Sequence, residues 1–173
     1  MVIVMSSSAS SAMPSPAGPR APTDVVITHP NRDKAEVQAT RATVVLLLLM
    51  SAALVLIITI AGWNVLEGAV VVQLAYAAIY LTLAFYAARW NRGVLPIAAV
   101  LAVLLAIFSL VAAPGWFDRD KAGFAAPDLL DAGLLGVLTL LIVPVQVLLV
   151  TFAMRGFKQG WNVELERRDP AYT

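Results

Sequence analysis

The sequence contains no cysteine, and its single histidine, His29, lies in a proline-rich stretch near the N-terminus. Disulfides, iron–sulfur clusters, Cys/His zinc sites, bis-histidine haem and Cys- or His-based nucleophilic catalysis require residues that this chain does not supply. We therefore expect no metal, no cofactor and no catalytic residues, and we predict that the protein is not an enzyme.

Charged residues are also scarce. Of the 173 residues, 13% are charged and 60% are hydrophobic, whereas a soluble domain is about one quarter charged and about half apolar. This composition predicts a membrane protein. No Asp, Glu, Lys, Arg or His lies in the central part of any apolar segment, which disfavours a coupled transporter, because such proteins hold or move charge at depth.

The N-terminal region lacks aromatic residues and is rich in serine and proline, so residues 1–30 are predicted to be a disordered tail. Residues 31–42 contain helix formers and predict a juxtamembrane helix that continues into the membrane. At the other end of the chain, Phe157, Trp161 and Leu165 recur at helical spacing among basic residues. Residues 157–173 are therefore predicted to be an amphipathic cytoplasmic segment.

Four uncharged intervals cover residues 42–66, 68–88, 93–117 and 132–154. Each is long enough to cross a hydrocarbon layer about 30 Å thick, and a single apolar segment in lipid must be helical to satisfy its own backbone. The expected fold is an all-α integral membrane protein, a four-transmembrane-helix bundle within residues 43–156. The expected spans are 43–62, 68–89, 94–113 and 129–154.

The positive residues are divided unequally between the two sides of this bundle. Ten lie on the side of both termini and two on the other, Arg119 and Lys121. The positive-inside rule then places both termini in the cytoplasm, and we expect a plasma membrane of bacterial type. One tryptophan follows each predicted span, as expected of anchors at the membrane interface: Trp63, Trp90, Trp116 and Trp161.

Small residues recur at helical spacing on three of the predicted spans. Helices in lipid associate by close approach at small residues, so these positions are predicted helix-packing sites. They are Ala77, Ala84, Ala98, Ala102, Ala106, Ser109, Ala132 and Gly136. The first span is Leu, Val and Ile nearly all round, and we expect it to have the greatest exposure to lipid or to a partner subunit.

Four of the polar residues within the spans are candidates for a polar pocket: Gln73, Tyr76, Tyr80 and Gln146. Gln73 is expected roughly 7 Å outward of the centre of its span, near Thr59 and Ser109, and Gln146 roughly 6 Å inward, near Tyr80. One interpretation is a set of interhelical hydrogen bonds worth about 0.6 kcal/mol each. The other is a polar pocket for a lipid headgroup, quinone or solute.

Two further features are a proline within the fourth span and the predicted external loop. Pro144 lacks an N–H in the middle of the fourth span, so a bend is expected there. Residues 114–128 form the predicted external loop, in which aromatic residues accompany charges of alternating sign. It is either a solvated loop before a helix that begins at Asp128 and Asp131, or a docking site for an external partner.

Three functions remain open on the sequence alone. The first is a non-catalytic accessory, structural or assembly subunit that packs against other integral membrane subunits. The second is a small homo-oligomeric carrier or pore for an uncharged or lipid-like solute. The third, an intramembrane enzyme, would depend on Asp128 and Asp131. The basic residues are interpreted as topology determinants beside the lipid surface, and no nucleic-acid binding is expected.

Overall fold

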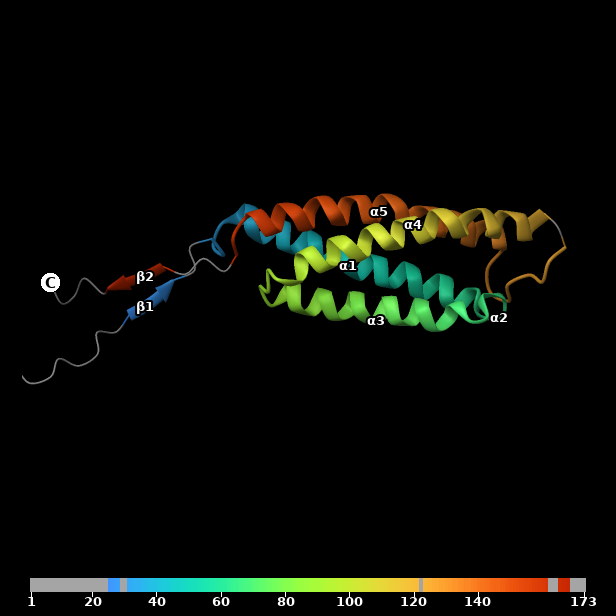
Figure 1. The fold of residues 1–173 in the computed structure, drawn as a ribbon, viewed down its shortest axis with the longest axis horizontal. Helices are drawn as coiled ribbons and strands as arrows, with labels where there is room; N and C mark the ends of the chain where they lie inside the picture. Colours follow the sequence, from blue (N-terminus) through green and yellow to red (C-terminus); the bar gives the residue numbers. More distant parts are fainter. Residues whose placement is uncertain (1–24, 29–30, 122, 162–164, 169–173) are drawn as a thin grey trace, which may run out of the picture.

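The protein is a bundle of four long helices, as the sequence predicts (Figure 1). The computed structural model describes residues 25–28, 31–121, 123–161 and 165–168. The long helices are α1 (Ala35–Ala61), α3 (Ala69–Ala88), α4 (Val94–Lys121) and α5 (Ala132–Lys158), and the one-turn helix α2 (Trp63–Leu66) follows α1. Each long helix has the length and the apolar composition to cross a membrane, so this is a multi-pass integral membrane protein.

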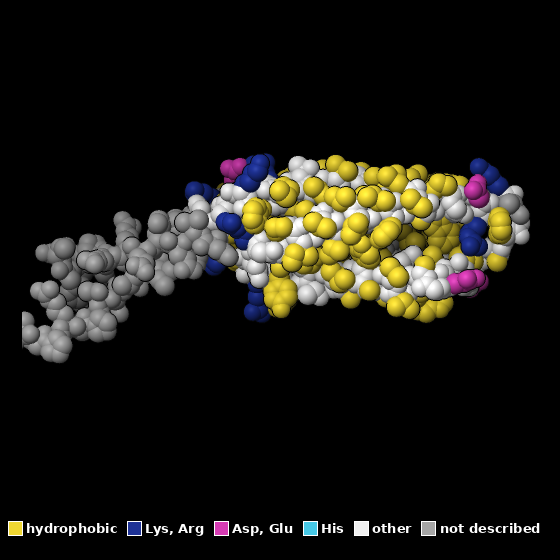
Figure 2. Space-filling view, viewed as in Figure 1, with side chains coloured by type: hydrophobic (Ala, Val, Ile, Leu, Met, Phe, Trp, Pro, Cys, Tyr) yellow, Lys and Arg dark blue, Asp and Glu magenta, His cyan; other side chains and the backbone are white. Residues whose placement is uncertain are grey.

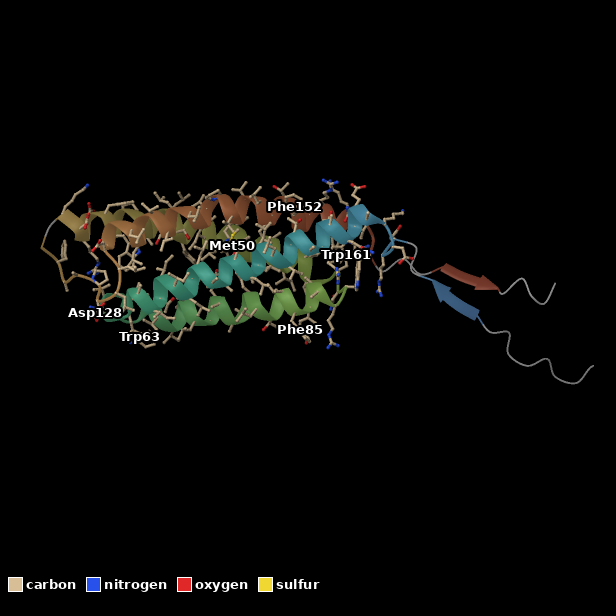
Figure 3. The ribbon with its side chains drawn as sticks, turned by 180° about the vertical axis from the view of Figure 1, so that it is seen from behind. Met50, Trp63, Phe85, Asp128, Phe152 and Trp161 are labelled. Atoms are coloured by element: carbon tan, nitrogen blue, oxygen red, sulfur yellow. The ribbon has the colours of Figure 1, made fainter. Side chains whose placement is uncertain are left out.

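Successive long helices run in opposite directions, which gives the bundle two distinct ends (Figure 1). The terminus end contains residues 31–41, 89–93 and 155–161, and the α2 end contains α2, the end of α4 and residues 123–131. Figure 3 shows Trp63 and Asp128 at the α2 end and Trp161 at the opposite end. Four crossings therefore bring the start of α1 and the end of α5 to the same side.

The position of α1 corrects one expectation. Its uniformly apolar sequence suggested exposure to lipid, but α1 is the most buried of the four helices and packs against both α3 and α5. Lipid tails are as apolar as leucine, so an all-round apolar helix gains nothing by facing lipid. Its many branched side chains instead fill the bundle interior, where Val44 and Leu48 are fully buried.

Helices α3 and α4 follow each other in the chain but contact each other little. α4 packs along α5, and α3 packs along α1. The two helices are joined by residues 89–93 at the terminus end and diverge toward the α2 end (Figure 1). The bundle is therefore closed at one end and opened between α3 and α4 at the other.

The end of α4 also differs from the expected span. The helix continues through Pro114 to Lys121, so the first part of the predicted loop 114–128 is helical. The aromatic residues after the proline explain this difference, because they pack inward. Trp116 is buried, and the ring of Phe117 lies against the position of Gly136 on α5. Helix α5 likewise continues through Pro144.

At the C-terminal side, the helical spacing of Phe157, Trp161 and Leu165 does not correspond to one continuous helix. α5 ends at Lys158, and Gly160 adopts a left-handed conformation with φ of 60°, which glycine tolerates and which terminates helices. Residues Leu165–Arg168 form a strand, β2, paired antiparallel with β1 (Val25–Thr28). The β-branched run in β1 explains why these four residues depart from the predicted disordered tail. Residues 1–24 of that tail lie outside the described residues.

The packing of α4 on α5 can be tested at its small residues. Ala98 and Ala102 are fully buried, and larger side chains in a packed interior cost about 1–3 kcal/mol at each site. We expect the Ala98→Leu, Ala102→Leu double variant to unfold at lower temperature in detergent than wild type. The Val100→Leu, Val103→Leu variant changes exposed positions of the same helix and should match wild type. Equal stability of the two variants would contradict this packing.

Candidate functional site

A buried polar network crosses the middle of the bundle and joins three helices. Tyr80 of α3 donates a hydrogen bond to Oε1 of Gln146 on α5 at 2.9 Å, and Nε2 of Gln146 donates to Oγ of Ser51 on α1 at 2.9 Å. Ser51 in turn donates to the carbonyl of Leu47. All three side chains are fully buried. The network is closed, because each of these side chains is bonded within the protein.

The four residues of the predicted polar pocket fall into two groups. Tyr80 and Gln146 belong to the buried network, whereas Gln73 and Tyr76 line a separate cleft. Oε1 of Gln73 accepts a hydrogen bond from Thr59 at 2.5 Å. The Thr59–Gln73 and Tyr80–Gln146 pairings agree with the depths estimated from the sequence. Gln73 and Gln146 therefore do not form one pocket.

The cleft opens where α3 and α4 diverge. It has a volume of about 330 Å³, and Figure 2 shows a hollow among hydrophobic side chains toward the α2 end of the bundle. Val55 and Ile58 of α1 and Thr139 and Ile142 of α5 line it, so they form its floor between the two walls. The wall on α3 includes Ala69, Val72, Gln73 and Tyr76, and the wall on α4 includes Leu105, Phe108, Ser109, Ala112 and Trp116.

The surface of the cleft is almost entirely apolar, although some of its lining residues carry polar groups. Among the hydrogen bonds of the described residues, the amide nitrogen of Gln73 and the hydroxyls of Tyr76 and Ser109 have no protein partner. The Tyr76 ring lies edge-on to Tyr80 at 6.1 Å and to Phe108 at 6.3 Å between ring centroids. The cleft is thus an apolar space between two helices, with polar residues among those that line it.

A second cavity, of about 430 Å³, adjoins the cleft at the α2 end. The two share Leu66, Ala112 and Trp116 as lining residues. Asp118 and Arg119 also line the second cavity, and the guanidinium of Arg119 lies 5.9 Å from the ring centroid of Phe124. The apolar cleft therefore leads to a mouth that carries one negative and one positive side chain.

At the terminus end, a cluster of tryptophan and arginine side chains packs the helices together. The rings of Trp90 and Trp161 meet edge-to-face at 5.8 Å, and the guanidinium of Arg41 lies 4.2 Å from the Trp90 ring centroid. Arg41 also donates to the carbonyl of Ala88 at 2.6 Å, and Asn31 donates to the carbonyl of Gly160 at 3.1 Å. These contacts bind the starts and ends of α1, α3 and α5 to one another.

Trp90 adopts an unusual backbone conformation within this cluster. Its φ is 64°, a left-handed value that costs a bulky residue about 1–2 kcal/mol. It follows the last residues of α3, and its N–H donates to Ala87 while that of Asn91 donates to Tyr86. This is the hydrogen-bond pattern of a Schellman helix end. The aromatic and cation–π contacts of Trp90 offset the cost, and a single sequence gives no local signal for such a position.

The four predicted tryptophan anchors differ in exposure. Trp63 is 56% exposed and Trp90 is half-buried, whereas Trp116 and Trp161 are 6% and 0% exposed. The latter two contact protein: Trp116 lies against Gly62, and Trp161 against Gly156. In this structure they act as packing residues of the bundle ends. Their position in the sequence, just after a span, does not distinguish a membrane-interface anchor from a packing residue.

The predicted helix-packing residues lie mainly inside the bundle. Seven of the eight are buried, and Ala106 is half-buried. The buried residues are Ala77, Ala84, Ala98, Ala102, Ser109, Ala132 and Gly136. Ser109 also lines the cleft. Small residues therefore serve the internal contacts of this chain, and an external partner would have to use a different surface.

The acidic residues at the start of α5 are exposed. Asp131 occupies the N-cap position, but its side chain makes no capping hydrogen bond. The preceding segment is fastened by Asn64 of α2, which donates to the carbonyl of Ala126 at 3.1 Å. Within the described ranges, no group of three or more His, Asp or Glu side chains is placed to hold a metal ion.

No family model, curated protein or solved structure matches this chain.

The buried network can be tested at Gln146. Gln146→Leu removes two interhelical hydrogen bonds, each worth about 0.6 kcal/mol and up to about 1.7 kcal/mol, so we expect a loss of about 1–3 kcal/mol in the free energy of unfolding. Tyr80→Phe should cost less in the Gln146→Leu background than in wild type, because its hydroxyl has then already lost its partner. Denaturant titration in micelles measures both effects. Additive losses would show that the two side chains are not coupled.

Proposed function

We propose that this protein is a non-catalytic accessory subunit that packs, through the outward face of α3, against a transmembrane helix of another integral membrane protein. The observation that carries the proposal is the exposure of this face. Ala75, Ala78 and Thr82 are exposed at spacings of three and four residues. The Thr82 hydroxyl donates to the Ala78 carbonyl at 2.8 Å, so it presents no unpaired group to lipid.

The packing of α3 supports this role. It is the least buried of the four helices and is held mainly by α1, because α4 diverges from it. In lipid, van der Waals packing at small side chains is a main source of helix association. Ala98, Ala99 and Ala102 of α4 are buried within the bundle, whereas the small residues on the outward face of α3 are exposed and can receive a helix from outside.

The buried network also favours a structural role. Tyr80, Gln146 and Ser51 are bonded to one another and lie apart from the cleft. In such an arrangement the polar groups hold the helices together. A path for a polar solute would need groups left free along it.

The outward face of α3 can be tested by affinity purification in a mild detergent. We expect wild type to co-purify with an integral membrane partner in constant stoichiometry. The Ala75→Leu, Ala78→Leu variant should lose that partner, because the larger side chains prevent close approach. Ala53→Leu changes an exposed alanine of α1 and should retain it. A monomeric wild type, or equal retention by the double variant, would refute the proposal, and self-association would replace it with a homo-oligomer.

A second candidate is a small homo-oligomeric carrier or pore for an uncharged or lipid-like solute. The cleft between α3 and α4 favours it, since it is an apolar space that continues to a charged mouth. Solute flux in liposomes that contain the protein alone would distinguish this function from that of an accessory subunit.

We also propose that the terminus end faces the cytoplasm. The described side chains Arg32, Lys34, Arg41, Arg89, Arg92, Arg155 and Lys158 belong to this end, and Arg119 and Lys121 to the other. Positive charge is retained on the cytoplasmic side during insertion. The proposed location is a plasma membrane of bacterial type.

The absence of cysteine allows a direct test of this orientation. An impermeant maleimide added to intact spheroplasts should label Asp128→Cys at the α2 end. It should label Asp33→Cys only after the membrane is permeabilised. Both native residues are exposed, so accessibility then depends on the side of the membrane. The reverse labelling pattern would place both termini outside.

A further inference from the structure

We propose that the cleft between α3 and α4 binds one phospholipid, with an acyl chain in the cleft and a zwitterionic headgroup at the mouth formed by Asp118 and Arg119. This inference does not depend on the function proposed above. It concerns a site within the chain, whereas the partner surface lies on the outward face of α3.

The size of the cleft favours a lipid tail over a helix. One turn of helix with its side chains, about 10 Å across and about 5.4 Å long, occupies roughly 420 Å³. The cleft has a volume of about 330 Å³, which is less than that of one such turn. A flexible, unbranched hydrocarbon chain fits such a narrow apolar space. The volume is also at the lower end of the range found for small-molecule sites.

The wall of the cleft discriminates an amphiphile from a pure hydrocarbon. Gln73 is the fifth residue of α3, so it lies roughly 6 Å from the start of the helix. The Thr59 hydroxyl lies 2.6 Å from the Val55 carbonyl and 2.5 Å from the Gln73 amide and has one proton to donate, so Thr59 occupies at most one of the two Gln73 N–H groups. Ester carbonyls of a phospholipid lie near this depth, accept hydrogen bonds and donate none. The remaining Gln73 N–H matches an ester oxygen at the top of an acyl chain.

The mouth adds charge of both signs. Arg119 supplies a planar set of N–H donors that suits a phosphate, and Asp118 lines the same cavity. A carboxylate beside the guanidinium disfavours a purely acidic headgroup and is complementary to an ammonium group. Trp116 and Ala112 line both cavities, so headgroup and tail of one molecule would occupy a continuous space.

The test uses full-length protein in phosphatidylcholine vesicles that contain a small fraction of phosphatidylethanolamine with a diazirine midway along one acyl chain. After irradiation, peptide mass spectrometry locates the labelled residues. We expect labelling of Leu105 and Phe108 in the cleft to exceed that of Val111, which faces outward with 75% exposure. An acidic phospholipid with the same photoreactive chain should label the cleft less, and Asp118→Asn should reduce this difference.

Two variants decide whether the label reports a site. Ala112→Trp fills the space shared by the two cavities and should lower cleft labelling about tenfold, a loss of about 1.4 kcal/mol in binding. Val111→Trp adds the same side chain on the outward face and should leave it unchanged. Gln73→Leu should lower labelling about threefold through the lost hydrogen bond, and Thr59 keeps its bond to the carbonyl of Val55 in that variant.

Equal labelling of the cleft and of Val111 would overturn the proposal, because it would mean only ordinary lipid around the bundle. Labelling that is insensitive to both Ala112→Trp and Gln73→Leu would overturn it as well. Monodisperse elution of each variant shows that it is folded. Loss of lipid labelling with retention of a protein partner, or the converse, separates this site from the proposed subunit function.

Discussion

The bundle depends on one amide that has no water to bond to. Gln146 lies at 0% exposure in the middle of α5, and it satisfies its oxygen with Tyr80 of α3 and its nitrogen with Ser51 of α1. In hydrocarbon an unpaired amide costs several kcal/mol, so helices that carry such groups must meet in one arrangement. Apolar packing alone would permit many rotations of a Leu- and Val-rich helix. The network fixes which faces of three helices point inward.

The two ends of the molecule differ in packing. The terminus end is densely packed and stabilises the bundle, whereas the α2 end contains the cleft that could bind a ligand. At the terminus end, Trp90, Trp161 and Arg41 form a dense cluster, and Trp90 tolerates a left-handed backbone because its contacts offset the cost. At the α2 end, α3 and α4 diverge and leave a cleft. The dense contacts and the open space therefore lie at opposite ends of the bundle.

Much of the fold was predictable from the sequence, because the limits of a transmembrane helix follow from charge and length. The four helices and the paired depths of Thr59 with Gln73 and of Tyr80 with Gln146 are of this kind. The central position of α1 was not, because Leu and Val are equally compatible with lipid and with protein. The cleft was not predictable either. Phe108 and Leu105 look like lipid-facing residues until the divergence of α3 from α4 is known. Trp161 was misplaced because one glycine, Gly160, turns the chain back onto the bundle.

The contact of Asn31 with Gly160 joins residues 129 positions apart in the chain. Helix α1 is made first during translation, yet its packing surface is completed by α5, which is made last. Synthesis proceeds at roughly 5–20 residues per second, so α1 waits in the translocon or lipid for several seconds before its final neighbour arrives. A helix that is apolar on every side is stable in lipid before α5 has been synthesised. The uniformly apolar surface of α1 therefore suits the order in which the helices are made.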